Sequence, residues 1–313
     1  MAADVLVKSH PATESIVGSL AQPSQNYLAI VIVTYNSGEV LPGLLDSIQL
    51  FGSAPRSAEV IVVDNDSQDD SVVVALTHPV APRLIRMGRN AGYAAGINAA
   101  TETIHADTDI LVLNPDIRLL RDTVEALRRR LSGPFVGVAV PRIIDDEGRL
   151  SHSLRREPSL LNGWADALLG STLAARLGVG EIVADAAAYH RDSRIEWATG
   201  AILAVSARAR ARVGGWDESF FLYSEEVDYL ERVRRSGLAV AFAAEATATH
   251  IGGEYHDNTF LSALMTTNRI RYFRRHHGRV ATAFYRLGII VGETMRAMLG
   301  PGHRAALRAA MTF

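Results

Sequence analysis

Short apolar runs, each ending in polar residues, recur along the first half of the chain. Residues 28–33 form a continuous apolar run, and apolar positions at helical spacing follow over residues 41–48. Apolar runs at 60–63 and 110–113, and the mixed segment 83–87, repeat the rhythm. A continuous apolar run is typical of a parallel strand that is covered on both faces. Four strand-then-helix units in succession predict an α/β fold with a mostly parallel, Rossmann-like sheet flanked by helices.

The rhythm changes beyond residue 141. We expect residues 142–194 to form an insertion that shapes the acceptor side of a site. The remaining predicted elements are a helical piece near 160–177, a strand at 197–205, a helix from Glu226 to Arg235, short strands at 238–243 and 246–249, and two C-terminal helices broken near Gly278. The chain then divides into a flexible arm (1–26), a main domain (27–258) and a helical, arginine-rich extension (259–313).

Polar residues follow each of the four predicted strands. They are Thr34, Tyr35 and Asn36, then Asp64 and Asn65, then Asn90 and Gly92, and finally Asn114 and Asp116. Any one of these groups alone would be an ordinary turn, since Asn, Asp and Gly are common in turns. In doubly wound sheets, however, ligands bind beyond the carboxyl ends of the strands. Four polar groups at that edge therefore predict a ligand site.

Three carboxylates, Glu225, Glu226 and Asp228, follow directly after the aromatic run 220–223. A helix start explains them equally well, because carboxylates favour the first turn of a helix and Ser224 is a suitable N-cap. The separate acid at Asp116, at the end of an apolar strand, favours a different interpretation. Two acidic sites on one scaffold suggest a metal site and a general base.

Composition excludes several classes of protein. The chain of 313 residues has 48% hydrophobic residues, a net charge of −2 and no cysteine, so disulfides and thiolate metal sites are excluded and nucleic acid is not an expected partner. No apolar run reaches about 18 residues, the length that a membrane-spanning helix needs. Neither a Walker phosphate loop nor a Gly-x-Gly-x-x-Gly after a strand is present.

The order of these motifs resembles that of family 2 glycosyltransferases. The segments that carry the resemblance are 33–36, 63–67, 90–98, 113–116, 214–221 and 225–228. These relatives are inverting enzymes of the GT-A fold, and the likeness is to their bacterial rhamnosyltransferase-like branch. It runs from about residue 28 to residue 250 and places the GT-A domain at 27–258.

The resemblance implies a nucleotide site at the strand ends. Asp64 would accept a hydrogen bond from the pyrimidine N–H of the donor. The other residues implied at this nucleotide site are Thr34, Tyr35, Asn36, Asn65, Asn90, Gly92, Asn98 and Asn114. Gly92 would let the backbone approach the nucleotide closely.

The resemblance also implies a metal and a base. Asn114-Pro115-Asp116 takes the place of the family's Asp-x-Asp, with Asp116 binding Mg²⁺ or Mn²⁺; the neutral Asn114 departs from that motif but remains an acceptable oxygen ligand. His250 matches the position of a further metal ligand in some relatives, and a structural histidine is the alternative. Glu226 stands where the family usually has an aspartate that acts as general base, with Glu225 and Asp228 as alternatives.

The function implied is transfer of a sugar, rhamnose first, from a dTDP- or UDP-linked donor to a polyprenyl-linked or polysaccharide acceptor of the cell envelope. Three alternatives stay open: a galactofuranosyl or other UDP-hexose transferase, a nucleotidylyltransferase, and a non-catalytic nucleotide-sugar-binding subunit. Residues 269–313 contain nine arginines and one acid, Glu293. Because basic helices suit anionic lipid, this excess predicts a peripheral contact with the cytoplasmic face of the plasma membrane. A homo-oligomeric contact is the alternative use of these arginines.

Overall fold

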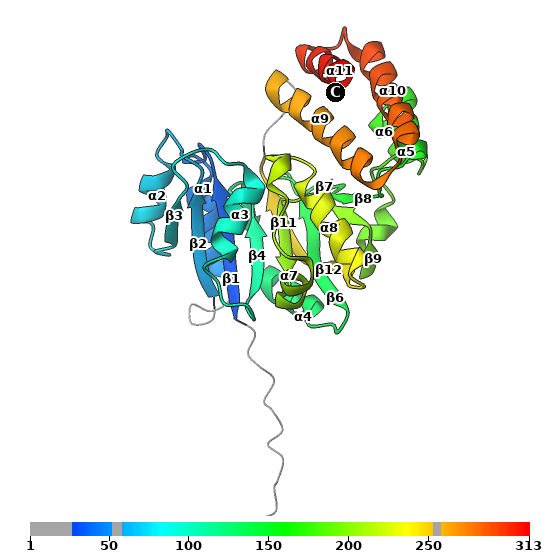
Figure 1. Cartoon of the computed structure of the whole chain (residues 1–313). Helices are drawn as coiled ribbons and strands as arrows, with labels where there is room; N and C mark the ends of the chain where they lie inside the picture. Colours follow the sequence, from blue (N-terminus) through cyan, green and yellow to red (C-terminus); the bar gives the residue numbers. More distant parts are fainter. Residues whose placement is uncertain (1–26, 52–57, 253–257) are drawn as a thin grey trace, which may run out of the picture.

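The computed structural model describes residues 27–51, 58–252 and 258–313. Its centre is a mixed, mostly parallel sheet with helices on both faces (Figure 1). The path of strands is β3 (Arg83–Arg86), β2 (Ala58–Asp64), β1 (Leu28–Thr34), β4 (Asp109–Leu113), β11 (Ile202–Val205), β6 (Val136–Ile144), β12 (Ala239–His250) and β5 (Ile117–Leu119). The expected arm at 1–26 lies outside the described residues.

The first four strands pair in parallel, as the apolar runs predict. In β1 every residue is buried, and its neighbours β2 and β4 run in the same direction. The direction reverses at β11, which is antiparallel to β4 and to β6. Two further strands join the same sheet: β7 (Leu150–Ser151) pairs with β6, and β9 (Ser193–Ile195) pairs with β12. A separate small sheet consists of β8 (Leu154–Arg155) and β10 (Trp197–Ala198).

Two hydrophobic cores cover the two faces of the sheet. One contains α1 (Leu41–Phe51), α2 (Ser71–Thr77) and α4 (Thr123–Leu131), and the other contains α3 (Tyr93–Thr101), α7 (Ala207–Val213) and α8 (Glu225–Arg235). Trp197 and Trp216 are both buried in the second core. Alternate residues of β1 therefore supply the two cores, as a strand buried on both faces requires.

A separate group of helices lies beyond the carboxyl ends of the parallel strands (Figure 1). It consists of α5 (Leu160–Leu169), α6 (Ser171–Arg176), α9 (Thr259–His276), α10 (Arg279–Arg296) and α11 (Pro301–Thr312), and we call it the helical cap. Two short 3-10 turns complete the described elements, η1 (Ala186–Tyr189) and η2 (Glu218–Phe220). None of the described helices is both long and apolar enough to cross a membrane.

The second half of the chain differs from its predicted elements in four places. Residues 239–250 form one strand with an irregular register between Ala243 and Thr247, where two short strands were expected. The predicted strand at 197–205 is interrupted between Ala198 and Ile202. The C-terminal region holds three helices, because Gly300 and Pro301 end one helix and begin another. Ser224 precedes α8 as expected, but its side chain makes no capping hydrogen bond.

Candidate functional site

The polar strand ends gather around one cavity of about 770 Å³. Of the residues that the sequence predicts for a site, those lining it are Thr34, Tyr35, Asn65, Asn90, Gly92, Asn114 and Asp116. They come from the ends of β1, β2, β3 and β4, which are neighbours in the sheet. Phe260 and Leu261 of α9 also line the cavity, so the helical cap closes part of its border.

Asp116 and His250 meet at one end of this cavity. The Oδ2 atom of Asp116 lies 3.1 Å from Nε2 of His250, because β5 and the end of β12 pair side by side. The Oδ1 atom of Asp116 is buried and has no hydrogen-bond partner. A Cβ atom at Gly252 would lie 2.5 Å from Asp116 Oδ2 and 2.7 Å from His250 Nε2, so glycine leaves space beside both atoms.

This pair fits a divalent cation. An unpartnered carboxylate oxygen, an imidazole nitrogen and open space next to both are what such an ion requires. Within the described ranges no cluster of three or more His, Cys, Asp or Glu side chains is assembled, so the other ligands must come from elsewhere. A cation that binds a substrate diphosphate and keeps several waters needs only one or two protein ligands.

A second pair of acids, the buried Glu225 and the half-buried Glu226, lies within electrostatic range of Tyr93. Glu225 and Glu226 begin α8, and each has a buried Oε2 atom with no hydrogen-bond partner. Burial raises the pKa of Glu226 to about 7. Burial, followed by the charge of Glu226, raises the pKa of Glu225 well above its ordinary value. A carboxylate whose pKa lies near neutrality is suited to accept a proton.

Tyr93 connects the two acidic sites. Its side chain lines the cavity, and its hydroxyl donates to the carbonyl of Gly200 at 3.4 Å. Burial raises the pKa of Tyr93 well above its ordinary value, and the charges of Glu225, Asp116 and Glu226 add to that rise. All three carboxylates thus lie within electrostatic range of this one phenol. The sequence did not single out Tyr93, although its place one residue after Gly92 was a usable signal.

Asp228 is the alternative base that the structure favours least. Its Oδ2 atom accepts from Nε of Arg232 at 2.7 Å. Burial by itself raises the pKa of Asp228, but the nearby His276 and then Arg232 outweigh burial and hold the pKa below its ordinary value. An ion-paired carboxylate with a lowered pKa is a poor proton acceptor near neutral pH.

Three other predicted residues have roles in shaping the loops. The side-chain oxygen of Asn36 accepts from the backbone N–H of Gln68 at 2.7 Å. Asp64 is buried and accepts from the backbone N–H of Ser67 at 3.3 Å, beneath the turn that follows β2. Asn98 lines a different cavity, where its amide donates to the carbonyl of Trp216 and to Glu218, both at 2.9 Å. Contacts of these side chains with nucleotide stay predictions.

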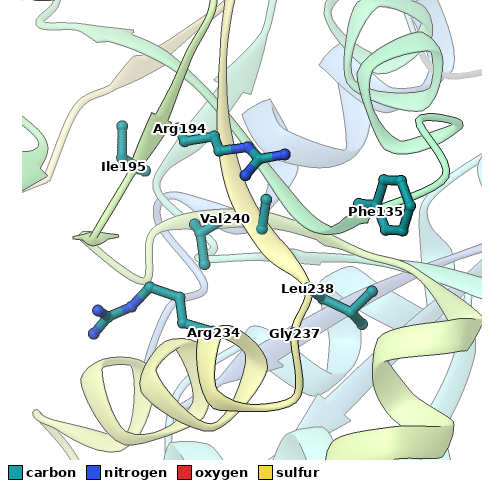
Figure 2. A pocket seen from close by; sticks show the side chains of 8 residues that line it. Phe135, Arg194, Ile195, Arg234, Gly237, Leu238 and Val240 are labelled. Carbon is teal, nitrogen blue, oxygen red and sulfur yellow. The ribbon is translucent and has the colours of Figure 1, made fainter.

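A further hollow of about 420 Å³ lies at the amino-terminal ends of β6 and β12 (Figure 2). Arg194 and Arg234 border it, together with apolar side chains that include Phe135 and Leu238. It lies at the opposite ends of the strands from Asp116, and no carboxylate lines it. The cavity at the carboxyl ends is therefore the candidate active site.

The fold is that of the GT-A glycosyltransferases. Residues 29–193 match the glycosyl transferase family 2 domain, and the chain belongs to that family. It is 29% identical over 241 residues to the N-acetylglucosaminyl-diphospho-decaprenol L-rhamnosyltransferase of Mycobacterium tuberculosis, covering 71% of this chain and 75% of the relative. It is 23% identical over 237 residues to the rhamnosyltransferase WbbL of Escherichia coli K12, covering 73% and 84%.

Solved structures confirm the fold. A mannosyltransferase of Pyrobaculum calidifontis, determined in complex with GDP-Man and Mn²⁺, superposes with a TM-score of 0.59 at 15% identity. The superposition covers 93% of this chain and 88% of that one. At this coverage the likeness in fold extends well beyond the matched family domain of residues 29–193.

Proposed function

We propose that this enzyme transfers rhamnose, with inversion, from a pyrimidine-diphosphate donor to a lipid-linked acceptor at the cytoplasmic face of the plasma membrane. One observation carries the proposal: Asp116, in contact with His250, lines the same cavity as Tyr93, and Tyr93 lies within electrostatic range of Glu225 and Glu226 as well. The sugar comes from the two rhamnosyltransferase relatives, and the lipid-linked acceptor comes from the name of the Mycobacterium tuberculosis one.

Asp116 and His250 would hold a divalent cation, Mg²⁺ or Mn²⁺. When bound there, the cation neutralises negative charge on the diphosphate leaving group. The unpartnered Oδ1 of Asp116 supports this assignment, because a buried carboxylate oxygen without a partner is costly unless a ligand satisfies it. Asn114 lines the same cavity and offers a neutral oxygen.

Glu226 is the proposed general base. The acceptor hydroxyl gives its proton to the carboxylate while its oxygen attacks the anomeric carbon, and the bond to the diphosphate oxygen breaks with its electron pair. A partly buried carboxylate with a pKa of about 7 is ionised often enough and is basic enough for this step. A Cβ at Gly200 would lie 3.3 Å from Cβ of Glu226, so glycine keeps the space beside the base free of a side chain.

Thr34, Tyr35 and Asn65 are proposed to line the nucleotide. Tyr35 is exposed at the cavity border, where its ring is free to lie against a base. Asn65 donates to the carbonyl of Gly92 at 3.0 Å, while its own Oδ1 is buried and has no partner. That oxygen is available to accept from a ribose hydroxyl or a base N–H.

A donor panel tests the proposal. The purified enzyme is titrated with dTDP-rhamnose, UDP-galactofuranose, UDP-glucose and free UDP, each with Mn²⁺, with Mg²⁺ and with a chelator, and slow donor hydrolysis is followed. We expect metal-dependent binding, and hydrolysis fastest with dTDP-rhamnose. Hydrolysis that is fastest with a UDP-hexose would mean that the donor sugar is not rhamnose. Binding without any hydrolysis would favour a non-catalytic nucleotide-sugar-binding subunit. Exchange of the nucleotide onto a sugar phosphate would favour a nucleotidylyltransferase.

A further inference from the structure

Helix α10 buries three small residues and Tyr285, and it leaves several large apolar residues exposed. Its buried positions are Thr282, Tyr285, Gly288 and Gly292. The glycines allow close packing on α5, where a Cβ at Gly288 would lie 3.2 Å from Trp164 and a Cβ at Gly292 would lie 2.9 Å from Ala167. Helices of soluble proteins usually place their large apolar residues inward, so this arrangement needs a reason.

One side of α10 carries an apolar stripe formed by the exposed Val280, Phe284, Leu287 and Met295 and the half-buried Val291. At 3.6 residues per turn these five positions fall within an arc of about 80° and extend along most of a helix about 27 Å long. Leu287 is 46% exposed and Val280 is 71% exposed. Met298, in the turn after the helix, is 93% exposed and continues the same line.

The charged residues of α10 turn away from this stripe. Arg286 donates to the carbonyl oxygens of Ala310 and Met311, both at 2.6 Å. Arg296 donates to the carbonyl of Asp166 at 3.1 Å, and Glu293 accepts from His303 at 2.8 Å. Arg286, Glu293 and Arg296 are therefore paired inside the helical cap, and the outward side of α10 is left apolar.

Helix α5 adds to the same face. It runs parallel to α10, since Trp164 and then Ala167 contact Gly288 and then Gly292. Leu161 and Leu168 of α5 are 74% and 51% exposed. Around the axis of α5, Leu161 and Leu168 lie about 100° from the residues that contact α10. Around the axis of α10, the stripe lies about 100° from the residues that contact α5, but in the opposite direction of rotation. Because the two helices are parallel, both sets of apolar side chains lie on the same side of the helix pair.

The charge around this face is positive. From Asn258 to Phe313, a stretch that is described throughout, Glu293 is the one acid, and it is paired with His303. Arg279, at the first position of α10, and Arg304 and Arg308, on α11, are exposed. By contrast Arg269, Arg271 and Arg275 of α9 face the protein: Arg269 pairs with Glu181 at 2.9 Å, and Arg271 and Arg275 bond to Ser219 and Asp217.

We propose that this face of α5 and α10 docks the enzyme flat on an anionic lipid bilayer. An amphipathic helix that lies in the membrane plane has one apolar side, which enters the headgroup region, and cationic residues beside it. A second copy of the chain fits less well, because a two-fold contact through this face would bring Arg279, Arg304 and Arg308 of one copy near the same arginines of the other. The inference stands on the surface alone and does not depend on the sugar, the acceptor or the base.

Vesicle flotation of the full chain tests it. The vesicles are phosphatidylcholine alone, or phosphatidylcholine with phosphatidylglycerol, each at low and high salt and without donor. We expect binding to the anionic vesicles that weakens with salt. The triple variant Val280→Gln, Phe284→Gln, Leu287→Gln should bind about tenfold more weakly or worse, since the apolar contact supplies much of the affinity. The matched control is Leu50→Gln, Val73→Gln, Leu76→Gln, which alters equally exposed apolar residues on α1 and α2.

Two outcomes would overturn the proposal. One is equal flotation of the parent and the stripe variant, provided that circular dichroism shows both folded. The other is a dimer by light scattering that the stripe variant dissociates, which would make a second copy the occupant. Because the chain has no cysteine, Leu287→Cys and Leu76→Cys can also each carry a polarity-sensitive fluorophore. Only the probe at 287 should shift to the blue on anionic vesicles, and a shift at 76 alone would place the membrane elsewhere.

Discussion

The backbone N–H of Tyr93 donates a 2.7 Å hydrogen bond to the carbonyl oxygen of Phe221. This bond joins the start of α3, which lines the cavity, to the turn that leads into α8 and its acids. Gly92 makes the approach possible: its φ is +91°, and a Cβ there would lie 2.3 Å from the same carbonyl oxygen. This hydrogen bond thus fixes the position of the proposed donor site relative to the turn that precedes the proposed base.

The turn from Phe221 to Ser224 is unusual in its backbone. Phe221, Tyr223 and Ser224 have φ values of 62°, 69° and 73°, all in the left-handed region. Such conformations cost free energy and persist where the surroundings impose them. Asn268 of α9 is one such constraint, because its amide donates to the carbonyls of Phe220 and Leu222.

We therefore expect Asn268→Ala to lower the free energy of unfolding by about 1–3 kcal/mol, the usual cost of leaving buried polar groups unpaired. Turnover should fall as well, since the turn positions Glu226. Thr267→Ala is the control, because that hydroxyl bonds only to Ala263 within α9. Thermal melts and initial rates of the two variants provide the comparison, and an Asn268→Ala enzyme as stable as Thr267→Ala would contradict the role.

Removing the proposed metal ligand should affect donor binding and turnover together. Asp116→Ala is expected to abolish the dependence of donor affinity on Mn²⁺ or Mg²⁺, because the cation joins protein and diphosphate. His250→Ala should weaken metal affinity by a smaller factor. Calorimetric titration of metal and UDP measures both effects. If Asp116→Ala keeps its full metal response, Asp116 is not a ligand.

The sequence predicted most of the sheet and the cavity but not what connects them. Apolar runs such as β1, followed by Asn or Asp, are local patterns, so the parallel strands and the polar edge of the sheet could be predicted from them. The contact between Gly92 and Phe221 could not, because a positive φ at a phenylalanine leaves no local signal. The sequence also predicted two strands where residues 239–250 form one, because the irregular register of that strand depends on its partner β6, which is distant in sequence.

The arginines of α9 show the same limit in another form. Their number predicted a basic surface, yet Arg269, Arg271 and Arg275 bond to groups more than 50 residues away in the sequence. The apolar stripe on α10 was also visible only in part, since sequence alone does not say which side of a helix faces inward. Composition predicts a basic surface, and packing decides which face is available for the proposed membrane contact.

Asp64→Ala should weaken the binding of free pyrimidine diphosphate by roughly 1.5–3 kcal/mol, the range for hydrogen bonds to charged groups. The expected cause is loss of an acceptor for the base N–H. Asp66→Ala, two residues on and exposed, is the matched control and should bind as the parent does. An unchanged affinity in Asp64→Ala, with an unchanged melting temperature, would limit Asp64 to supporting the turn at Ser67.

The acid pair offers a direct separation of roles. Glu226→Gln should lower kcat by about 10²–10⁴-fold, the usual contribution of a positioned base, while leaving donor and metal affinity nearly unchanged. Glu225→Gln keeps the size and shape of the glutamate side chain and leaves Glu226 unchanged, so it should retain most activity. Single-turnover rates and donor titrations of both variants are the measurement. Loss of activity in Glu225→Gln alone would transfer the base to Glu225.

The pH dependence follows from the same pair. Glu226 must be ionised to accept a proton, and burial raises its pKa to about 7, so kcat should rise with pH up to about 7 and level above it.

The stability of the fold should change with pH in the opposite direction. A carboxyl whose pKa is higher in the folded than in the unfolded state stabilises the fold fully below the unfolded value of 4.5, and that contribution is lost as the pH rises through about 7. Glu226→Gln removes the buried charge, so it should melt at a higher temperature than the parent at about pH 8 and at nearly the same temperature at about pH 4.5. A parent enzyme whose rate is flat from about pH 5 to pH 8, with no stability gain in Glu226→Gln, would show that this carboxylate is ordinary and is not the base.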